Sequence, residues 1–453
     1  MAGSPRVVIL AAGLGTRMRS TLPKVLHPLG GRPLIDHVID LAASVSSEPP
    51  VVVVNPAQPD VAQAIAGRGQ AVEQAEAYGT GDALRSVPAA QRSDGALLVL
   101  SADVPLVLPD TLRRLLETHQ AEHPAATMLT FVPDAPAGLG RVVRDRDGKV
   151  VRVVEEADLA GAEAPAEANA GVYVFEASRL WPALERLSAA NAQGEYYLTD
   201  AIEILGDVAT VPAQDPEEAL GINDRTQLAQ AEAVVRRRTL ERLMRSGVTV
   251  EDPATTYVDV TVEIGADTVI RPLTHIRGSS RIGRFCEIGP GARLRGVRAA
   301  DHVVVGASEL DECELGEAVE IGAYCRVRPN TTLAPGVQLG THAEVKNSTV
   351  GAGTRINHFA CVLDSQVGRD VNIGAGTVTC NFDGATKHRT WIGDGVFVGT
   401  NSTLVAPLRL GDGCYVAAGS VVTEDVPPGA LAVGRSRQRN VEGWVERRKA
   451  AAQ

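Results

Sequence analysis

The sequence predicts two folds in series: a layered α/β domain with a mainly parallel sheet, followed by a left-handed parallel β-helix of hexapeptide repeats. Over residues 1–225, short β-branched runs alternate with helical patterns, as in α/β domains. Beyond residue 260, aliphatic residues recur every six positions, a period typical of a hexapeptide β-solenoid. Only 4% of the residues are aromatic, which agrees with a narrow solenoid axis that excludes large rings.

In the first domain, continuous apolar runs predict strands that are buried on both faces, at residues 7–10, 51–54 and 97–100. Helical patterns between them predict helices at residues 33–44, 60–66 and 110–119. A charged stretch without Gly or Pro then predicts a linker helix that ends near Gly247. The expected organisation is therefore a first domain at 1–225, a linker helix at 226–247 and a solenoid with a C-terminal tail at 248–453.

The six-residue period runs in three phases, interrupted twice. Its members are Ile264, Ile270, Ile276, Ile282, Ile288 and Leu294; Leu315, Ile321, Val327, Leu333, Leu339 and Val345; and Ile392, Val398, Leu404, Leu410, Val416 and Val422. With three faces to a coil, roughly 200 residues make about ten coils. Flat solenoid walls pack against copies of themselves, most simply in a closed trimer.

The composition of the chain limits the kinds of partner that it can bind. Of the 453 residues, 44 are Lys or Arg and 55 are Asp or Glu, so the formal net charge is −11. An acidic chain has no general attraction for nucleic acid, and no apolar run approaches the roughly 18 residues of a membrane span. All six cysteines follow residue 285 without a C-x-x-C pair, which is typical of reduced core residues. We expect a cytoplasmic protein that binds neither nucleic acid nor membrane.

A glycine-rich turn, Leu10-Ala11-Ala12-Gly13-Leu14-Gly15-Thr16-Arg17-Met18, follows the first predicted strand. Such turns bring backbone N–H groups close to phosphate. The dinucleotide pattern fails because Met18 replaces its third Gly, and no Gly-Lys-Ser/Thr of a P-loop is present. A simple tight turn is the alternative, but Arg17 and Lys24 supply two cations that suit a phosphate.

Asp103 follows the strand at 97–100, at the edge where open α/β sheets bind ligands. A carboxylate there suits Mg²⁺, which also takes oxygens from substrate phosphates; a helix-capping role before Pro105 is the alternative.

In the solenoid, His358 is the candidate base, although a lone His is more often structural. Arg328 and Lys346 lie 18 residues apart, which is one turn, so they should stack on one face near Arg326. Cations beside a His would hold a sugar phosphate next to a general base.

Several motifs carry a resemblance over nearly the whole chain. They are residues 10–18 with 22–27, Gly79-Thr80-Gly81, Asp103-Val104-Pro105, residues 193–200, and residues 372–377 with 380–384. The first half resembles a Rossmann-like sugar nucleotidyltransferase. The whole chain resembles the bifunctional N-acetylglucosamine-1-phosphate uridyltransferase/glucosamine-1-phosphate N-acetyltransferase family. The resemblance implies UTP, N-acetylglucosamine-1-phosphate, glucosamine-1-phosphate and acetyl-CoA as substrates, Mg²⁺ as the metal and a homotrimer.

The resemblance also implies site residues. In the first domain, Asp103 and Asn223 would hold Mg²⁺, and Arg17 and Lys24 would stabilise the phosphates. The UDP-sugar would contact Leu10, Ala11, Ala12, Gly13, Lys24, Gln74, Gly79, Thr80, Ser101, Asp103, Gly140, Glu155, Asn169 and Asn223. In the solenoid His358 would be the base. Glucosamine-1-phosphate would contact Arg328, Lys346, Cys361 and Asn372, and acetyl-CoA would contact Ala375, Asn381, Phe382, Thr400, Ala418 and Arg435.

Four positions depart from the family pattern: Cys361 and Phe382 stand where Tyr is common, and Ser101-Ala102 precedes Asp103. The loss of a phenol at 361 predicts weaker sugar-phosphate binding. Alternatives are therefore a nucleotidyltransferase whose solenoid has weak or altered acetyltransferase activity, or a solenoid that is only a trimerisation scaffold. A zinc site using His275, His302, His342, His358 or His388 and a reactive Cys361 thiol are further hypotheses. The basic tail at 435–453 either covers the CoA phosphates or is solvated.

Overall fold

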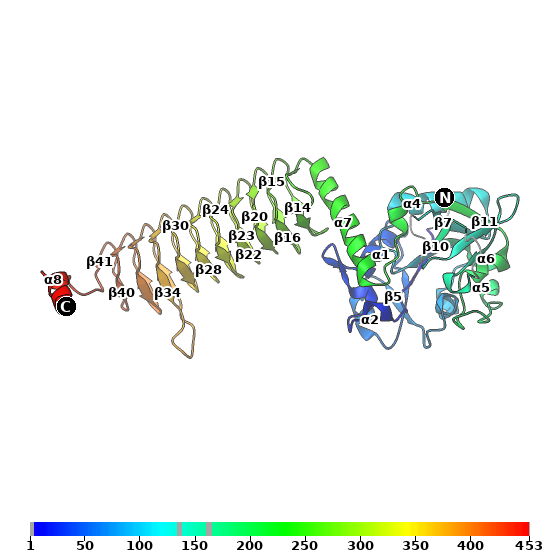
Figure 1. The fold of residues 1–453 in the computed structure, drawn as a ribbon, viewed down its shortest axis with the longest axis horizontal. Helices are drawn as coiled ribbons and strands as arrows, with labels where there is room; N and C mark the ends of the chain where they lie inside the picture. The colour runs from blue at the N-terminus through cyan, green and yellow to red at the C-terminus, as the bar shows by residue number, and fades with distance from the viewer. Residues whose placement is uncertain (1–3, 134–137, 160–164, 453) are drawn as a thin grey trace. The chain divides into compact units, whose positions relative to one another are not determined.

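The computed structural model describes residues 4–133, 138–159 and 165–452. The chain forms two compact units, Met1–Arg236 and Arg237–Gln453. The first contains a mixed sheet with helices, and the second is a stack of short strands whose coils follow one another in chain order (Figure 1). Within the described residues, no helix is both long and apolar enough to cross a membrane.

The central strands of the first unit's sheet run parallel. The loops that follow the carboxyl ends of these strands therefore lie together at one edge of the sheet. Its order is β11 (Val208–Pro212), β7 (Ala126–Phe131), β10 (Ala168–Glu176), β6 (Ala96–Ser101), β1 (Arg6–Leu10), β4 (Val51–Val54) and β5 (Gln70–Glu73), with the hairpin β8 (Arg141–Arg144) and β9 (Val150–Val154) beside β10. All neighbouring pairs of that main order are parallel except those of β10, which is antiparallel to β6 and β7. The predicted mainly parallel sheet is confirmed.

Helices cover both faces of this sheet because alternate strand residues point to opposite sides. On one face lie α1 (Leu34–Ala43), α2 (Pro59–Ala64) and α4 (Pro109–Glu122). On the other lie α3 (Thr80–Arg85), α5 (Ala177–Leu184) and α6 (Asp200–Leu205). The predicted helices at 33–44, 60–66 and 110–119 are thus present, with ends shifted by up to three residues.

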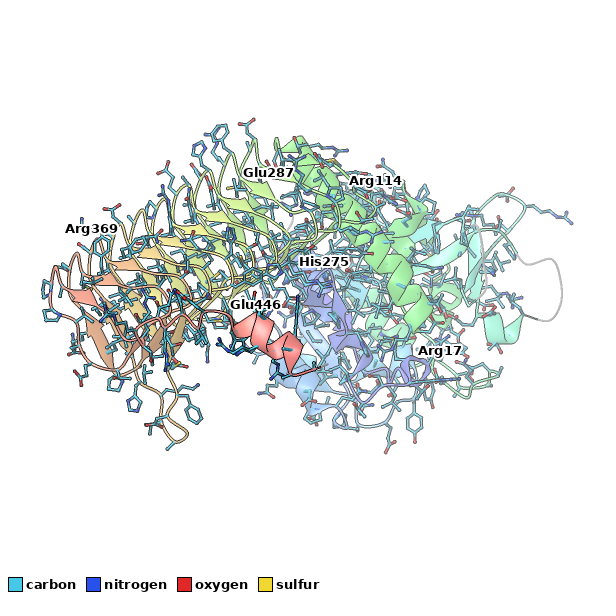
Figure 2. The ribbon with its side chains drawn as sticks, turned by 60° about the vertical axis from the view of Figure 1, so that its left-hand side comes forward. Arg17, Arg114, His275, Glu287, Arg369 and Glu446 are labelled. Carbon is cyan, nitrogen blue, oxygen red and sulfur yellow. The ribbon has the colours of Figure 1, made fainter. Side chains whose placement is uncertain are left out.

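The second unit has three parallel faces. Face 1 holds eleven strands from β12 (Thr249–Val250) to β41 (Leu431–Ala432), face 2 holds ten from β13 (Tyr257–Val258) to β40 (Val421–Val422), and face 3 holds nine from β14 (Glu263–Ile264) to β38 (Leu408–Leu410). Every predicted period residue is buried except Ile264, which is half-buried. Aromatic rings such as Phe285, Tyr324 and Phe359 are exposed instead. Charged side chains such as Glu287 and Arg369 project outward from the coils (Figure 2).

Helix α7 (Arg225–Arg245) contributes to both units. In the first unit, Glu232 accepts a hydrogen bond from the backbone N–H of Gly30 at 2.8 Å. In the second, Leu240 and Leu243 are buried in the solenoid core. Gly247, at φ 97°, follows the helix in the left-handed conformation that glycine favours.

One insertion interrupts the solenoid. Residues 381–389 leave the stack after β34 (Val378–Cys380) and return at β35 (Thr390–Ile392), as the protruding loop after β34 shows (Figure 1). A pairing between Phe382 and Lys387 closes this loop. The insertion is why the sequence period is interrupted before Ile392.

Candidate functional site

A cavity of about 410 Å³ opens in the first unit at the carboxyl ends of the parallel strands. The pairing of Leu10 with Ser101 places the loops that follow β1 and β6 side by side. The predicted residues that line the cavity are Leu10, Ala11, Ala12, Gly13, Lys24, Gln74, Gly79, Thr80, Ser101 and Asp103. The other predicted residues of this unit, Arg17, Gly140, Glu155, Asn169 and Asn223, are not among those that line it.

Lys24 reaches the cavity because the glycine-rich turn leaves room for it. Gly15 adopts φ +63°, and a Cβ there would lie 2.5 Å from Cβ of Lys24. The residue at position 15 must therefore be glycine both for its conformation and for this close approach. Arg17 sits on the adjoining 3₁₀ turn and is exposed.

Two oxygens converge on the Lys24 ammonium. Its Nζ lies 2.6 Å from Oδ2 of Asp103 and 3.3 Å from Oδ1 of Asn223. The backbone N–H of Ile222 donates to the carbonyl of Asp103 at 2.8 Å, which fixes the segment that carries Asn223. A carboxylate and an amide oxygen that face the same ammonium group have the donor chemistry that suits Mg²⁺ when phosphate oxygens complete its shell.

A separate polar cluster joins Gly140, Glu155 and Asn169. The N–H of Asn169 donates to the carbonyl of Gly140 at 2.9 Å, and a Cβ at 140 would lie 3.4 Å from both carboxylate oxygens of Glu155. Thr199 donates its hydroxyl to Glu155 at 2.8 Å. Burial raises the pKa of Glu155, with smaller contributions from nearby carboxylates, and the hydrogen bond from Thr199 opposes this. The cluster can thus present one carboxyl group to a sugar.

Gln74 is also held in a fixed orientation. Its Nε2 donates to the carbonyl of Gly79 at 3.2 Å and to Asp82 at 2.8 Å. The side chain is buried, so the protein itself holds the amide in this orientation.

In the second unit, five residues occupy equivalent turn positions before face 2 in successive coils, and we call them the corner column. The carbonyl of each of the first four accepts a hydrogen bond from the backbone of the next coil at 2.8–3.1 Å. The members are Thr341, His358, Ala375, Thr400 and Ala418. The structure therefore aligns the predicted base with three of the predicted acetyl-CoA contacts. Arg435 approaches the same edge, since a Cβ on Gly419 would lie 4.0 Å from its Cδ.

The predicted cations lie on face 2, at the edge opposite His358. Val327 pairs with Val345, which brings Arg328 and Lys346 into register as the 18-residue spacing predicts. Lys346 in turn pairs with Leu363, five residues beyond His358 on the next coil. Arg328 forms an ion pair with Glu344 at 2.9 Å. Cys361 shares this face, whereas Asn372 lies on face 1, where Asn357 donates to it at 3.3 Å.

The sequence reasoning missed a further cation, Lys387. The positive charge of Lys387 is the main reason why the pKa of Lys346 is lowered, with desolvation and Arg328 adding to the effect. Lys387 lies in the 381–389 loop, outside the hexapeptide register, so counting repeats could not place it. Its signal in the sequence was its position three residues after the Cys380–Gly384 motif.

Asp364 anchors this loop. It is buried and accepts hydrogen bonds from Asn347 at 2.5 Å and from the predicted acetyl-CoA contact Asn381. Burial raises the pKa of Asp364, but the two amide hydrogen bonds and the ammonium groups of Lys346 and Lys387 outweigh it, so the net pKa is lowered. Phe382, in the same loop, is 58% exposed.

The structure offers no support for the zinc hypothesis: within the described residues, no three His, Cys, Asp or Glu side chains are grouped as a metal site requires. The thiol of Cys361 has its pKa raised by burial and by Glu344, which does not favour a reactive thiolate. All six cysteines are free.

Fold and sites together define a nucleotidyltransferase joined to a hexapeptide-repeat transferase. Comparisons with known proteins agree: residues 7–205 match the MobA-like NTP transferase domain, residues 261–296 match the bacterial transferase hexapeptide, and residues 309–427 match the GMPPB C-terminal domain. The chain belongs to the bifunctional GlmU protein family. It is 43% identical to the protein of Caldanaerobacter subterraneus subsp. tengcongensis, over 97% of each chain. It is 44% identical to that of Mycolicibacterium gilvum, over 98% of this chain and 92% of the relative.

Proposed function

We propose that this bifunctional enzyme makes UDP-N-acetylglucosamine in two reactions. The solenoid transfers an acetyl group from acetyl-CoA to the amine of glucosamine-1-phosphate. The first unit then transfers a uridylyl group from UTP to N-acetylglucosamine-1-phosphate and releases pyrophosphate. The observation that carries the proposal is the convergence of Lys24, Asp103 and Asn223 beside a glycine-rich cavity, in a chain that matches bifunctional relatives along nearly its whole length.

In the uridylyl reaction, an oxygen of the sugar phosphate attacks the α-phosphorus of UTP, and the bond to the β-phosphate oxygen breaks. Asp103 and Asn223 would hold Mg²⁺, which would supply charge neutralisation at the phosphates. Lys24 and Arg17 add positive charge to the phosphates, because this transfer needs positioning and charge stabilisation more than covalent help. Gly140, Glu155 and Asn169 hold the amino sugar, and Gln74 with Gly79 and Thr80 orients the uracil.

In the acetyl reaction, the amine attacks the thioester carbon, an N–C bond forms, and the C–S bond breaks to release the CoA thiolate. His358 takes the proton from the amine at Nε2 and passes it to the sulfur. Arg328, Lys346 and Lys387 bind the sugar phosphate with Cys361 and Asn372. Ala375, Asn381, Phe382, Thr400, Ala418 and Arg435 form the acetyl-CoA groove.

The division of these residues between faces supports a homotrimer. Asn372 lies on face 1, while Arg328, Lys346 and Cys361 lie on face 2. We infer that one complete acetyl-transfer site takes groups from neighbouring copies, which closed three-fold packing of flat walls allows. The six free thiols agree with a cytoplasmic location, and neither nucleic acid nor membrane is among the proposed partners.

The test measures the two reactions separately on the purified chain. Glucosamine-1-phosphate with acetyl-CoA should yield free CoA thiol, and N-acetylglucosamine-1-phosphate with UTP and Mg²⁺ should yield pyrophosphate. Uridylyl transfer without acetyl transfer would instead assign the solenoid a scaffold role. Absence of uridylyl transfer under Mg²⁺ would overturn the proposal for the first unit.

A further inference from the structure

A bulge in strand β10 brings two side chains that are four positions apart into contact. Nδ2 of Asn169 lies 2.5 Å from the hydroxyl oxygen of Tyr173. Residues four positions apart in a regular strand are separated by about 13 Å, so a straight strand could not make this contact. The pairing of β10 with β7 shifts register between Asn169 and Tyr173, and Gly171 within the shift adopts φ +72°. The left-handed conformation of this glycine therefore shortens the strand and creates the contact.

Gly171 is held by a side chain on each of its two backbone polar groups. Its carbonyl accepts a hydrogen bond from Oγ of Ser101 at 3.1 Å, and its N–H donates to Oδ1 of Asn169 at 3.0 Å. Because a backbone N–H can only donate, the atom of the Asn169 amide that faces it must be the oxygen. This contact fixes which way round the amide lies, so Nδ2 must be the atom that faces Tyr173.

The Tyr173 hydroxyl accepts one of the two hydrogens of Nδ2. Tyr173 is only 4% exposed, and its ring stacks on that of Phe175 with the centroids 5.3 Å apart. Burial raises the pKa of Tyr173, and the negative charge of Glu155 adds to the effect, so the phenol stays protonated at neutral pH. A phenylalanine would fill the same space without burying a hydroxyl, so packing alone does not require the tyrosine.

We propose that Tyr173 is a positioning residue for sugar binding: its hydroxyl holds the Asn169 amide in one plane, so that the second hydrogen of Nδ2 is presented to the amino sugar. Gly171 engages the amide oxygen and Tyr173 engages the first hydrogen. Asn169 therefore meets the sugar as a hydrogen-bond donor, and the sugar group opposite it must carry an acceptor oxygen. Tyr173 itself does not touch the sugar. This inference rests on the proposed role of Asn169 in sugar binding.

The test compares Tyr173→Phe with the wild-type chain at full length. We expect KM for N-acetylglucosamine-1-phosphate to rise about fivefold, as for the loss of one neutral hydrogen bond. The kcat of uridylyl transfer and KM for UTP should stay nearly unchanged, which reports that the first unit is folded. Acetyl transfer should be normal. Tyr324→Phe, at an exposed tyrosine of the second unit, also removes one phenol and is the matched control; it should leave the kinetics of uridylyl transfer unchanged.

A second comparison separates this inference from the proposed function. Asn169→Ala should raise KM for the sugar phosphate at least as much as Tyr173→Phe does. If Asn169→Ala leaves this KM unchanged, the proposed contact of Asn169 with the sugar fails, and the role of Tyr173 fails with it. In the Asn169→Ala background, Tyr173→Phe should cause no further rise, because the hydroxyl acts only through the amide.

Two results would leave the sugar contact of Asn169 standing and overturn the role of Tyr173 alone. In the first, Asn169→Ala raises KM for the sugar phosphate while Tyr173→Phe does not. In the second, Tyr173→Phe raises this KM further when Asn169 is already alanine. A loss in Tyr173→Phe that appears in kcat, or equally in KM for UTP, indicates a general distortion of the unit and also overturns the role of Tyr173.

Discussion

Nζ of Lys24 lies 2.6 Å from Oδ2 of Asp103, although the two residues are 79 positions apart in the chain. The Lys24 side chain is only 10% exposed and that of Asp103 is 29% exposed. Removing one partner therefore leaves a poorly hydrated charge, and this pair governs the first testable prediction.

Lys24→Ala should lower uridylyl transfer by about a hundredfold or more, because a positive charge at the phosphates is lost. Acetyl transfer should stay near normal, since Lys24 belongs to the other unit. Both rates are measured on the same preparation, and Lys149→Ala, at an exposed lysine, serves as the control. Pyrophosphate release retained at the normal rate would contradict the role of Lys24.

Lys387→Ala should raise KM for glucosamine-1-phosphate about tenfold, because one of three cations is lost. The same change removes the positive charge that lowers the pKa of Lys346. Since a lysine loses its charge as pH rises through its pKa, the alkaline rise in KM should move to higher pH in the variant. Initial rates between pH 7 and 10 test this, and an unshifted alkaline limb would argue against contact between the two lysines.

Gly340→Ala should abolish acetyl transfer while uridylyl transfer persists. The new Cβ would lie 2.8 Å from the backbone N of His358 and 2.9 Å from its Nδ1, so the ring must move. Gly95→Ala is the control, because a Cβ there meets nothing within 4 Å. An active Gly340→Ala enzyme would mean that the position of this ring is not critical.

Asp364→Ala should destabilise the chain by about 2 kcal/mol at pH 7, since a buried carboxylate and its two amide partners lose their hydrogen bonds. Because the folded pKa of Asp364 is lowered, its contribution is full above the unfolded pKa and disappears as pH falls through the folded value. Urea unfolding of wild type and variant should therefore converge toward acidic pH. A difference in stability that is constant with pH would contradict the assignment of charge to Asp364.

Cys361→Tyr should lower KM for glucosamine-1-phosphate several-fold, which corresponds to about 1 kcal/mol for one added hydrogen bond. Cys361 is half-buried and lies beside Glu344 on face 2. Cys361→Ser, which is too short to make that bond, should behave as wild type. Equal KM values in all three proteins would show that position 361 does not contact the sugar phosphate.

The solenoid could be predicted closely because its strand register follows from counting residues along the six-residue repeat. Six-residue spacing identifies Val327 and Val345 as neighbours, and Arg328 and Lys346 follow from them. The prediction of the α/β sheet was less complete. Nothing local in the sequence indicates that β10 runs antiparallel, because its direction depends on its pairing with β6 and β7.

The sequence could predict which residues are candidates for the sites, but it could not predict the contacts between them. Lys24 and Asp103 were both candidates, yet their ion pair depends on how two distant loops meet. His358 was expected beside the cations, whereas the structure separates them across face 2. Thr341 carried no signal in the sequence, since its contact with His358 depends on the orientation of a ring one coil away.

Leu240 and Leu243 of α7 cover the end of the solenoid core at its first coil. The terminal strand β12 has a hydrogen-bonded neighbour on one side only, so an open end of this kind is a template for the edge of another chain. The two leucines of the helix therefore shield the apolar core from water at the end where strand pairing stops. A truncated chain that begins immediately after α7 should consequently assemble into fibres, in which the open end of one solenoid pairs with the end of the next.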